Sequence, residues 1–174
     1  QENFADTQDH YVTLVTFCSC EMRQVFDKVP AAEARPLTMD DYEPCCGTPL
    51  YDAMGFTLTA MQRHVKDMTD AVVVVTVITD GYENDSIEWD GASVKKLIDR
   101  LCKKGWVFTY IGANQDAALE AGKIGVKNSL TFEATIEGTV NMFAFEKQSR
   151  QRWNKRVRLN ENDFQNAYFS DDDK

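Results

Sequence analysis

The chain has 174 residues, of which 43% are hydrophobic and 27% are charged, and its formal net charge is −9. This length and composition are typical of one globular domain with a sizeable core. The negative charge argues against nonspecific binding to nucleic acid or to an anionic membrane surface, and it favours cations or basic partners.

The sequence also indicates the cellular compartment, through its hydropathy and its cysteine content. No apolar run reaches about 18 residues, so we expect no membrane-spanning helix and no membrane partner. The five cysteines are an odd number, so at least one thiol cannot pair within the chain. The simplest interpretation is a reduced, cytoplasmic protein.

Two strands are predicted near the N-terminus. Residues 1–10 are polar and are interpreted as the end of a preceding helix or as a leader. Residues 11–20, YVTLVTFCSC, are rich in β-branched and aromatic residues and predict a strand. Residues 22–30, MRQVFDKVP, predict a second strand, and residues 31–47 lack periodicity and predict a loop.

An amphipathic helix is predicted next, running to Met68. Thr48 as its N-cap and Pro49 as its first residue are both favoured at those positions. The apolar residues that follow recur at the spacing of one helical face. They are Leu50, Ala53, Met54, Thr57, Leu58, Met61, Val65 and Met68.

Residues 71–79, AVVVVTVIT, form an apolar run that ends at Asp80-Gly81. A strand that is apolar on both faces is typical of the interior of a sheet covered by helices on both sides. Ligands of such sheets bind beyond the carboxyl ends of the strands. Asp80 is therefore predicted to lie where a polar side chain can face a site.

Helices and strands alternate through the rest of the predicted domain. Asn114 is expected to cap the short helix that follows it, and Thr135 to open the final helix. The inward face of that final helix is predicted to carry Ile136, Val140, Phe143 and Ala144. The predicted elements are a helix at 92–105, a strand at 106–114, a helix at 115–125, a strand at 128–134 and the helix after Thr135.

This alternation predicts parallel βαβ units with right-handed crossovers. We therefore expect an α/β fold, a Rossmann-like three-layer sandwich. Its central sheet is predicted to be mostly parallel, with helices on both faces and one antiparallel edge strand. The domain is predicted to span residues 11–158, followed by a C-terminal tail at 159–174.

Three segments, in this order, resemble the von Willebrand factor type A (VWA) domain. GTPLYDAM at 47–54 resembles the threonine loop of that family and the helix behind it. VVVVTVITDGYEND at 72–85 resembles its fourth strand and aspartate loop. WVFTYIGANQDAALEAGKIGV at 106–126 resembles the fifth strand and the next helix in a bacterial and phage branch.

The resemblance implies a metal-ion-dependent adhesion site at the top of the sheet. It assigns the family's threonine to Thr48 and its aspartate to Asp80. The expected ion is Mg²⁺, or Mn²⁺ or Ca²⁺ in its place, and a carboxylate from a partner protein typically completes the shell. Hard cations of this kind prefer oxygen ligands and tolerate positions filled by water.

One element of the family pattern is missing. No D-x-S-x-S occurs in the chain, so the first strand and its two serine ligands are absent from this sequence. We therefore expect the natural protein to be longer, and Mg²⁺ binding by this chain to be weak or absent. Two apolar strand edges would also be left unpaired, which favours aggregation, strand addition or self-association.

Two other groups of residues were weighed as sites. Cys18, Cys20, Cys45 and Cys46 form C-x-C and C-C pairs, which fit poorly with the C-x₂-C pairs of zinc ribbons, so free, partly buried thiols are favoured over zinc. The basic segment 146–158 is expected to be the solvated end of the final helix, with a docking surface for an acidic partner, or more rarely for nucleic acid, as the alternative.

The leading hypothesis from the sequence is therefore a protein-binding module of VWA type, and not an enzyme. A metal-free interaction scaffold is the second. A metal-dependent hydrolase that uses Asp80 is the third, against which stands the lack of a clustered second carboxylate or histidine. His10 and His64 have no evident nucleophile partner, so a catalytic triad is not supported.

Overall fold

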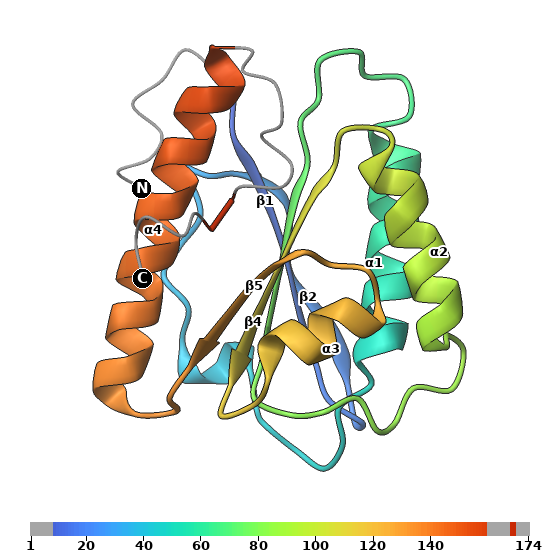
Figure 1. Ribbon diagram of the computed structural model, residues 1–174, viewed down its shortest axis with the longest axis vertical. Coiled ribbons are helices and arrows are strands. Elements are labelled where there is room, and N and C mark those ends of the chain that lie inside the picture. Colours follow the sequence, from blue (N-terminus) through green and yellow to red (C-terminus); the bar gives the residue numbers. More distant parts are fainter. Residues whose placement is uncertain (1–8, 160–167, 170–174) are drawn as a thin grey trace. The chain divides into compact units, whose positions relative to one another are not determined.

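The computed structural model describes residues 9–159 and 168–169, in which the protein has a mixed α/β fold (Figure 1). The chain divides into two compact units, and each contains its own sheet. The first unit comprises the residues up to His64 together with Glu83–Asp90. The second comprises Val65–Tyr82 and the residues from Gly91 onward.

The sheet of the first unit is an antiparallel hairpin. β1 (Tyr11–Phe17) pairs with β2 (Met22–Pro30). The second strand has the predicted bounds, but the first is three residues shorter than predicted. The reason is that residues 18–21 form the hairpin turn, in which the N–H of Cys18 donates to the carbonyl of Glu21 at 2.9 Å.

The hairpin is followed by the short 3-10 helix η2 (Met39–Asp41) and by α1 (Leu50–His64). Helix α1 is shorter than predicted at both ends, so Thr48 lies two residues before its first residue. Its C-terminal end is followed by Asp67, Thr69 and Asp70, which are poor helix formers. The buried apolar residues of α1 belong to the predicted face: Leu50, Ala53, Met54 and Leu58.

The sheet of the second unit has three parallel strands in the order β3-β4-β5. The connecting helix α2 buries Val94, Leu97, Ile98 and Leu101. Helical spacing in the sequence predicts these four residues and Cys102 on its inner face, and Cys102 is half-buried. The elements are β3 (Val74–Thr79), α2 (Gly91–Cys102), β4 (Val107–Ala113), α3 (Ala117–Lys123), β5 (Asn128–Phe132) and α4 (Ile136–Arg158).

The central strand of this sheet is β4, so the prediction that residues 71–79 form the interior strand is wrong for the sheet that the structure describes. Every residue of β4 is buried, whereas β3 lies at an edge and its Ile78 is 45% exposed. An apolar run in the sequence indicates a buried strand. It does not show which strands pair with that strand, so it does not decide between a central and an edge position.

The predicted cap of α3 is also corrected. Asp116 caps this helix, because its carboxylate accepts the N–H of Leu119 at 3.0 Å. Asn114 instead has a positive φ of 52°, and its side chain accepts the N–H of Ala134 at 3.0 Å. Asn tolerates this left-handed conformation better than most residues, so it serves the turn rather than the helix.

Helix α4 begins where predicted, after the cap Thr135, but it buries another face. Met142, Ser149 and Trp153 are its buried residues. The residues predicted to face inward are all exposed: Ile136, Val140, Phe143 and Ala144. Although α4 has 23 residues, neither it nor any other helix of the described chain is long and apolar enough to cross a membrane.

Tyr168, from the predicted C-terminal tail, belongs to the core of the second unit. It is 1% exposed, its hydroxyl donates to Glu146 at 2.8 Å, and Arg150 lies over its ring. Arg150 also donates to Glu146 and to Thr76, so this part of the basic segment 146–158 is structural rather than solvated. The rest of the predicted tail, apart from residues 159 and 169, and residues 1–8 of the predicted leader lie outside the described residues.

Candidate functional site

Asp80 lies at the carboxyl end of β3, directly after the strand, and is exposed. The adjacent turn is held by Thr79, whose hydroxyl accepts the N–H of Gly81 at 3.2 Å. The carbonyl of Thr79 accepts an N–H from the buried side chain of Gln115 at 3.2 Å. Asp80 is therefore presented to solvent from a backbone that hydrogen bonds hold on the sheet.

Thr48 lies in the first unit, in the segment that leads into α1. Its N–H donates to the side-chain oxygen of Asn84 at 2.8 Å, and its carbonyl accepts the N–H of Asn84 at 3.3 Å. Asp80 belongs to the second unit, and each unit is described by itself, so the proximity of Thr48 and Asp80 stays a prediction.

The carboxylates of Asp52 and Glu83, near the start of α1, accept hydrogen bonds from backbone N–H groups. Asp52 accepts the N–H groups of residues 87–89 at 2.7 to 2.9 Å. Glu83 accepts those of Tyr51 and of residues 85–86 at 2.8 to 3.0 Å. These bonds fix the loop 83–90 on the start of α1, so both carboxylates stabilise the loop.

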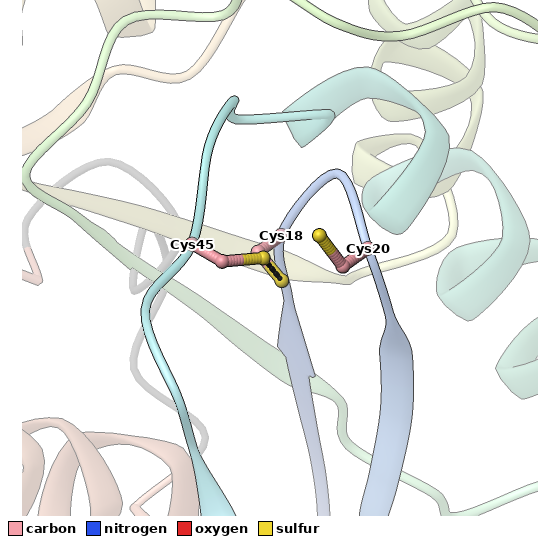
Figure 2. Close-up of side chains that lie close together, drawn as sticks. All are labelled: Cys18, Cys20 and Cys45. Carbon is pink, nitrogen blue, oxygen red and sulfur yellow. Dashed lines mark hydrogen bonds between the residues drawn. The ribbon is translucent and has the colours of Figure 1, made fainter.

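Four cysteines lie together in the first unit. Figure 2 shows Cys18 and Cys20 at the two sides of the β1–β2 turn, with Cys45 beside them on the loop that leads to α1. The sulfurs of Cys18 and Cys45 are 2.7 Å apart, and those of Cys20 and Cys46 are 4.0 Å apart. Hydrogen bonds with Cys45 and then Cys46 raise the pKa of Cys20 to about 12, so its exposed thiol keeps its proton at neutral pH.

The sequence favoured free, partly buried thiols, and the structure has four free thiols at these positions, from buried Cys18 to exposed Cys20 and Cys46. The sequence analysis considered these four thiols as one zinc site but disfavoured it, because their C-x-C and C-C spacing is unlike that of a zinc ribbon. The positions of the two pairs favoured a shared site, since Cys18 and Cys20 end a predicted strand and the other pair precedes the predicted helix at Thr48.

No comparable cluster forms around Asp80 in the described chain. Among residues 9–159 and 168–169, the cysteine cluster supplies the one set of three or more His, Cys, Asp or Glu ligand atoms close enough to hold a metal ion, namely those of Cys18, Cys20 and Cys45. Among the described residues, Asp80 is therefore not part of a group of three such ligand atoms.

Comparisons with protein-family models, with curated proteins and with solved structures gave no match. The resemblance to VWA domains therefore depends on the three sequence segments alone, and a function has to be argued from the residues themselves.

Proposed function

We propose that this protein is a protein-binding module of VWA type that recognises a partner's carboxylate through a divalent cation, with Mg²⁺ as the natural ion. Asp80 and Thr48 are the proposed protein ligands. The observation that carries the proposal is the position of Asp80, an exposed carboxylate directly after a parallel strand. Open α/β sheets bind their ligands at this edge.

A contact within the first unit supports the choice of Thr48 as the second ligand. Asn84 follows Asp80 by four residues in the chain, and it forms two hydrogen bonds with the backbone of Thr48. The loop that follows the aspartate in the chain is thus hydrogen-bonded to the threonine segment within the first unit.

The proposal includes a finer architecture, a Rossmann-like three-layer sandwich with helices on both faces of a mostly parallel sheet. Neighbouring residues of β4 support it, because successive side chains of a strand point to opposite faces. Tyr110 bonds to Gln115, beside α3, at 3.4 Å. Thr109 bonds to Thr76, which also accepts from Arg150 of α4, and this supports a placement of α3 and α4 on opposite faces.

The ion is expected to bind weakly. A threonine hydroxyl is a neutral ligand and Asp80 supplies a single carboxylate, so most of an octahedral shell is left to water. The chain lacks a D-x-S-x-S segment that would add further oxygens. A partner's carboxylate would then contribute a large share of the binding energy of the ternary complex.

Paramagnetic Mn²⁺ is the suitable probe, because it broadens nearby NMR signals even when it binds weakly. We expect broadening of the amide signals of residues 47–48 and 80–81 in the wild type, and its loss in Asp80→Asn. Asp70→Asn removes an equally exposed carboxylate of the second unit and should leave the broadening unchanged. Broadening that persists in Asp80→Asn, or that centres elsewhere, would overturn the assignment of the site.

A further inference from the structure

The two cysteine pairs are held together by hydrogen bonds that do not involve sulfur. Ser19, between Cys18 and Cys20, donates its N–H to the carbonyl of Gly47 at 3.2 Å, and its hydroxyl accepts the N–H of Gly47 at 2.6 Å. A Cβ at Gly47 would collide with the Ser19 hydroxyl, so this approach needs glycine. Gly47 directly follows residues 45–46, so the backbone itself gathers the four sulfurs.

Three of the four sulfurs, those of Cys18, Cys20 and Cys45, lie close enough together to share one tetrahedral ion, and the sulfur of Cys46 lies beside that of Cys20 but outside this set. Zinc at about 2.3 Å from each thiolate separates the sulfurs by about 3.8 Å. The sulfurs of Cys20 and Cys46 are 4.0 Å apart, and those of Cys18, Cys20 and Cys45 all lie within 4.8 Å of one another. The closest pair, Cys18 and Cys45 at 2.7 Å, has to open by about 1 Å, which small side-chain rotations can supply.

A disulfide between Cys18 and Cys45 is the competing chemistry. It would require an oxidant that accepts two electrons and two protons, and it would use only two of the four sulfurs. The sulfur of Cys20 lies within 4.8 Å of those of Cys18 and Cys45 and 4.0 Å from that of Cys46, so the pairs Cys18–Cys45 and Cys20–Cys46 are not isolated from each other.

We propose that Cys18, Cys20, Cys45 and Cys46 bind one Zn²⁺ ion as thiolates, each releasing its proton to solvent on binding. Thiolates are soft ligands that select Zn²⁺ rather than Mg²⁺, and four of them leave no open coordination position, so the ion is structural. Cys46 has a φ of 46°, which is uncommon outside glycine. Strained backbone of this kind is concentrated at functional sites, where the surrounding structure holds it in place. At Cys46 it would position the side chain as the fourth ligand.

A zinc ion at this position would cross-link two segments of the first unit, and we call this cross-link the staple. The ion joins the β1–β2 turn to the residues that enter α1, two positions before Thr48. The zinc site uses sulfur ligands and the proposed adhesion site uses oxygen ligands. A negative result for one proposal therefore does not decide the other.

Metal analysis of the whole chain, purified with a non-thiol reductant and without chelator, tests the staple. We expect about one zinc per chain in the wild type and in Cys102→Ser, whose cysteine lies outside the cluster in α2. Cys20→Ser and Cys46→Ser change exposed ligands and should lose the metal. Chelation should lower the melting temperature of the wild type and of Cys102→Ser, but not that of the two ligand variants.

Two further measurements need no variant. Cobalt substitution should give thiolate-to-cobalt charge-transfer absorption with the intensity of four thiolates. Chelated, denatured protein prepared without reductant should show all five thiols of the chain as titratable. Three titratable thiols would indicate one disulfide and one would indicate two, and either count would overturn the proposal. A reduced wild type that binds no zinc, or ligand variants that keep it, would do the same.

Discussion

At the scale of single residues, Asp41 is a buried carboxylate of the first unit that forms an ion pair with Arg35. It is 3% exposed, and Arg35 donates to both of its oxygens at 2.6 Å. The N–H of Thr38 adds a third hydrogen bond at 2.7 Å. The hydrogen bonds from Arg35, followed by that from Thr38, hold the pKa of Asp41 well below its ordinary value of 3.8.

A pH-dependent contribution to stability follows from this depressed pKa. Because the folded carboxylate binds its proton only at lower pH than the unfolded one, its stabilising contribution is complete above about pH 5 and is lost as the pH falls through the folded pKa. Urea unfolding should show Asp41→Asn to be less stable than the wild type at pH 7, with a smaller difference near pH 3. Asp40→Asn, an exposed neighbour with the same charge change, should show neither effect. A constant difference across this range would exclude the linkage.

Local sequence patterns predicted where the two proposed metal ligands lie, but their assignment as ligands follows from the resemblance and stays a prediction. The positions of Thr48 and Asp80 followed from local patterns, a helix start and a strand end, which a sequence displays directly. The cysteine cluster joins residues 26 and 27 positions apart through a turn and a glycine contact. Such tertiary contacts are not visible in local spacing, so the four thiols were considered and set aside.

At the scale of elements, the packing of α1 on the loop 83–90 depends on one glycine. Gly55 is buried in α1, and a methyl group at this position would overlap the indole of Trp89. Alanine normally stabilises a helix relative to glycine by about 0.5–1 kcal/mol. In this case overpacking should dominate, and we expect Gly55→Ala to destabilise the protein by about 1–3 kcal/mol in urea unfolding.

Gly122→Ala is the matched control. Gly122 lies in α3, and no atom would lie within 4 Å of its added Cβ, so the helix preference should appear alone as a gain in stability. Trp89→Leu in the Gly55→Ala background should restore part of the loss by removing the overlapping ring. If Gly55→Ala and Gly122→Ala shift the urea midpoint in the same direction, the inference that Gly55 packs too closely against Trp89 to accept a methyl group is wrong.

Hydrophobic periodicity predicted the buried face of a helix correctly where that face is wholly apolar. The inner face of α2 was correct because Val94, Leu97, Ile98 and Leu101 follow the helical period without interruption. The inner face of α4 was wrong because its buried stripe includes Ser149, and its half-buried neighbours Glu146 and Arg150 bond to each other. A buried stripe that satisfies polar groups internally does not look hydrophobic, so periodicity pointed to the exposed apolar residues instead.

At the scale of the whole molecule, the pairing of the strands was the hardest feature to predict. The composition of β3 correctly indicated a strand in a parallel sheet, and β4 pairs with it along its whole length. No other described strand pairs with the opposite edge of β3. The backbone groups along such an edge can pair with another chain, and exposed apolar residues increase that tendency.

Self-association is therefore expected to depend on this edge. Edge strands are commonly protected by lysine, so Ile78→Lys, at a position 45% exposed in β3, should reduce association. Leu119→Lys makes a comparable apolar-to-lysine change at a position 59% exposed in the helix α3. In sedimentation velocity, the wild type and Leu119→Lys should sediment faster as concentration rises, whereas Ile78→Lys should stay close to the monomer. A wild type that remains monomeric at every concentration would show that the free edge of β3 does not recruit a second chain. Equal suppression by both lysines would instead assign the effect to net charge.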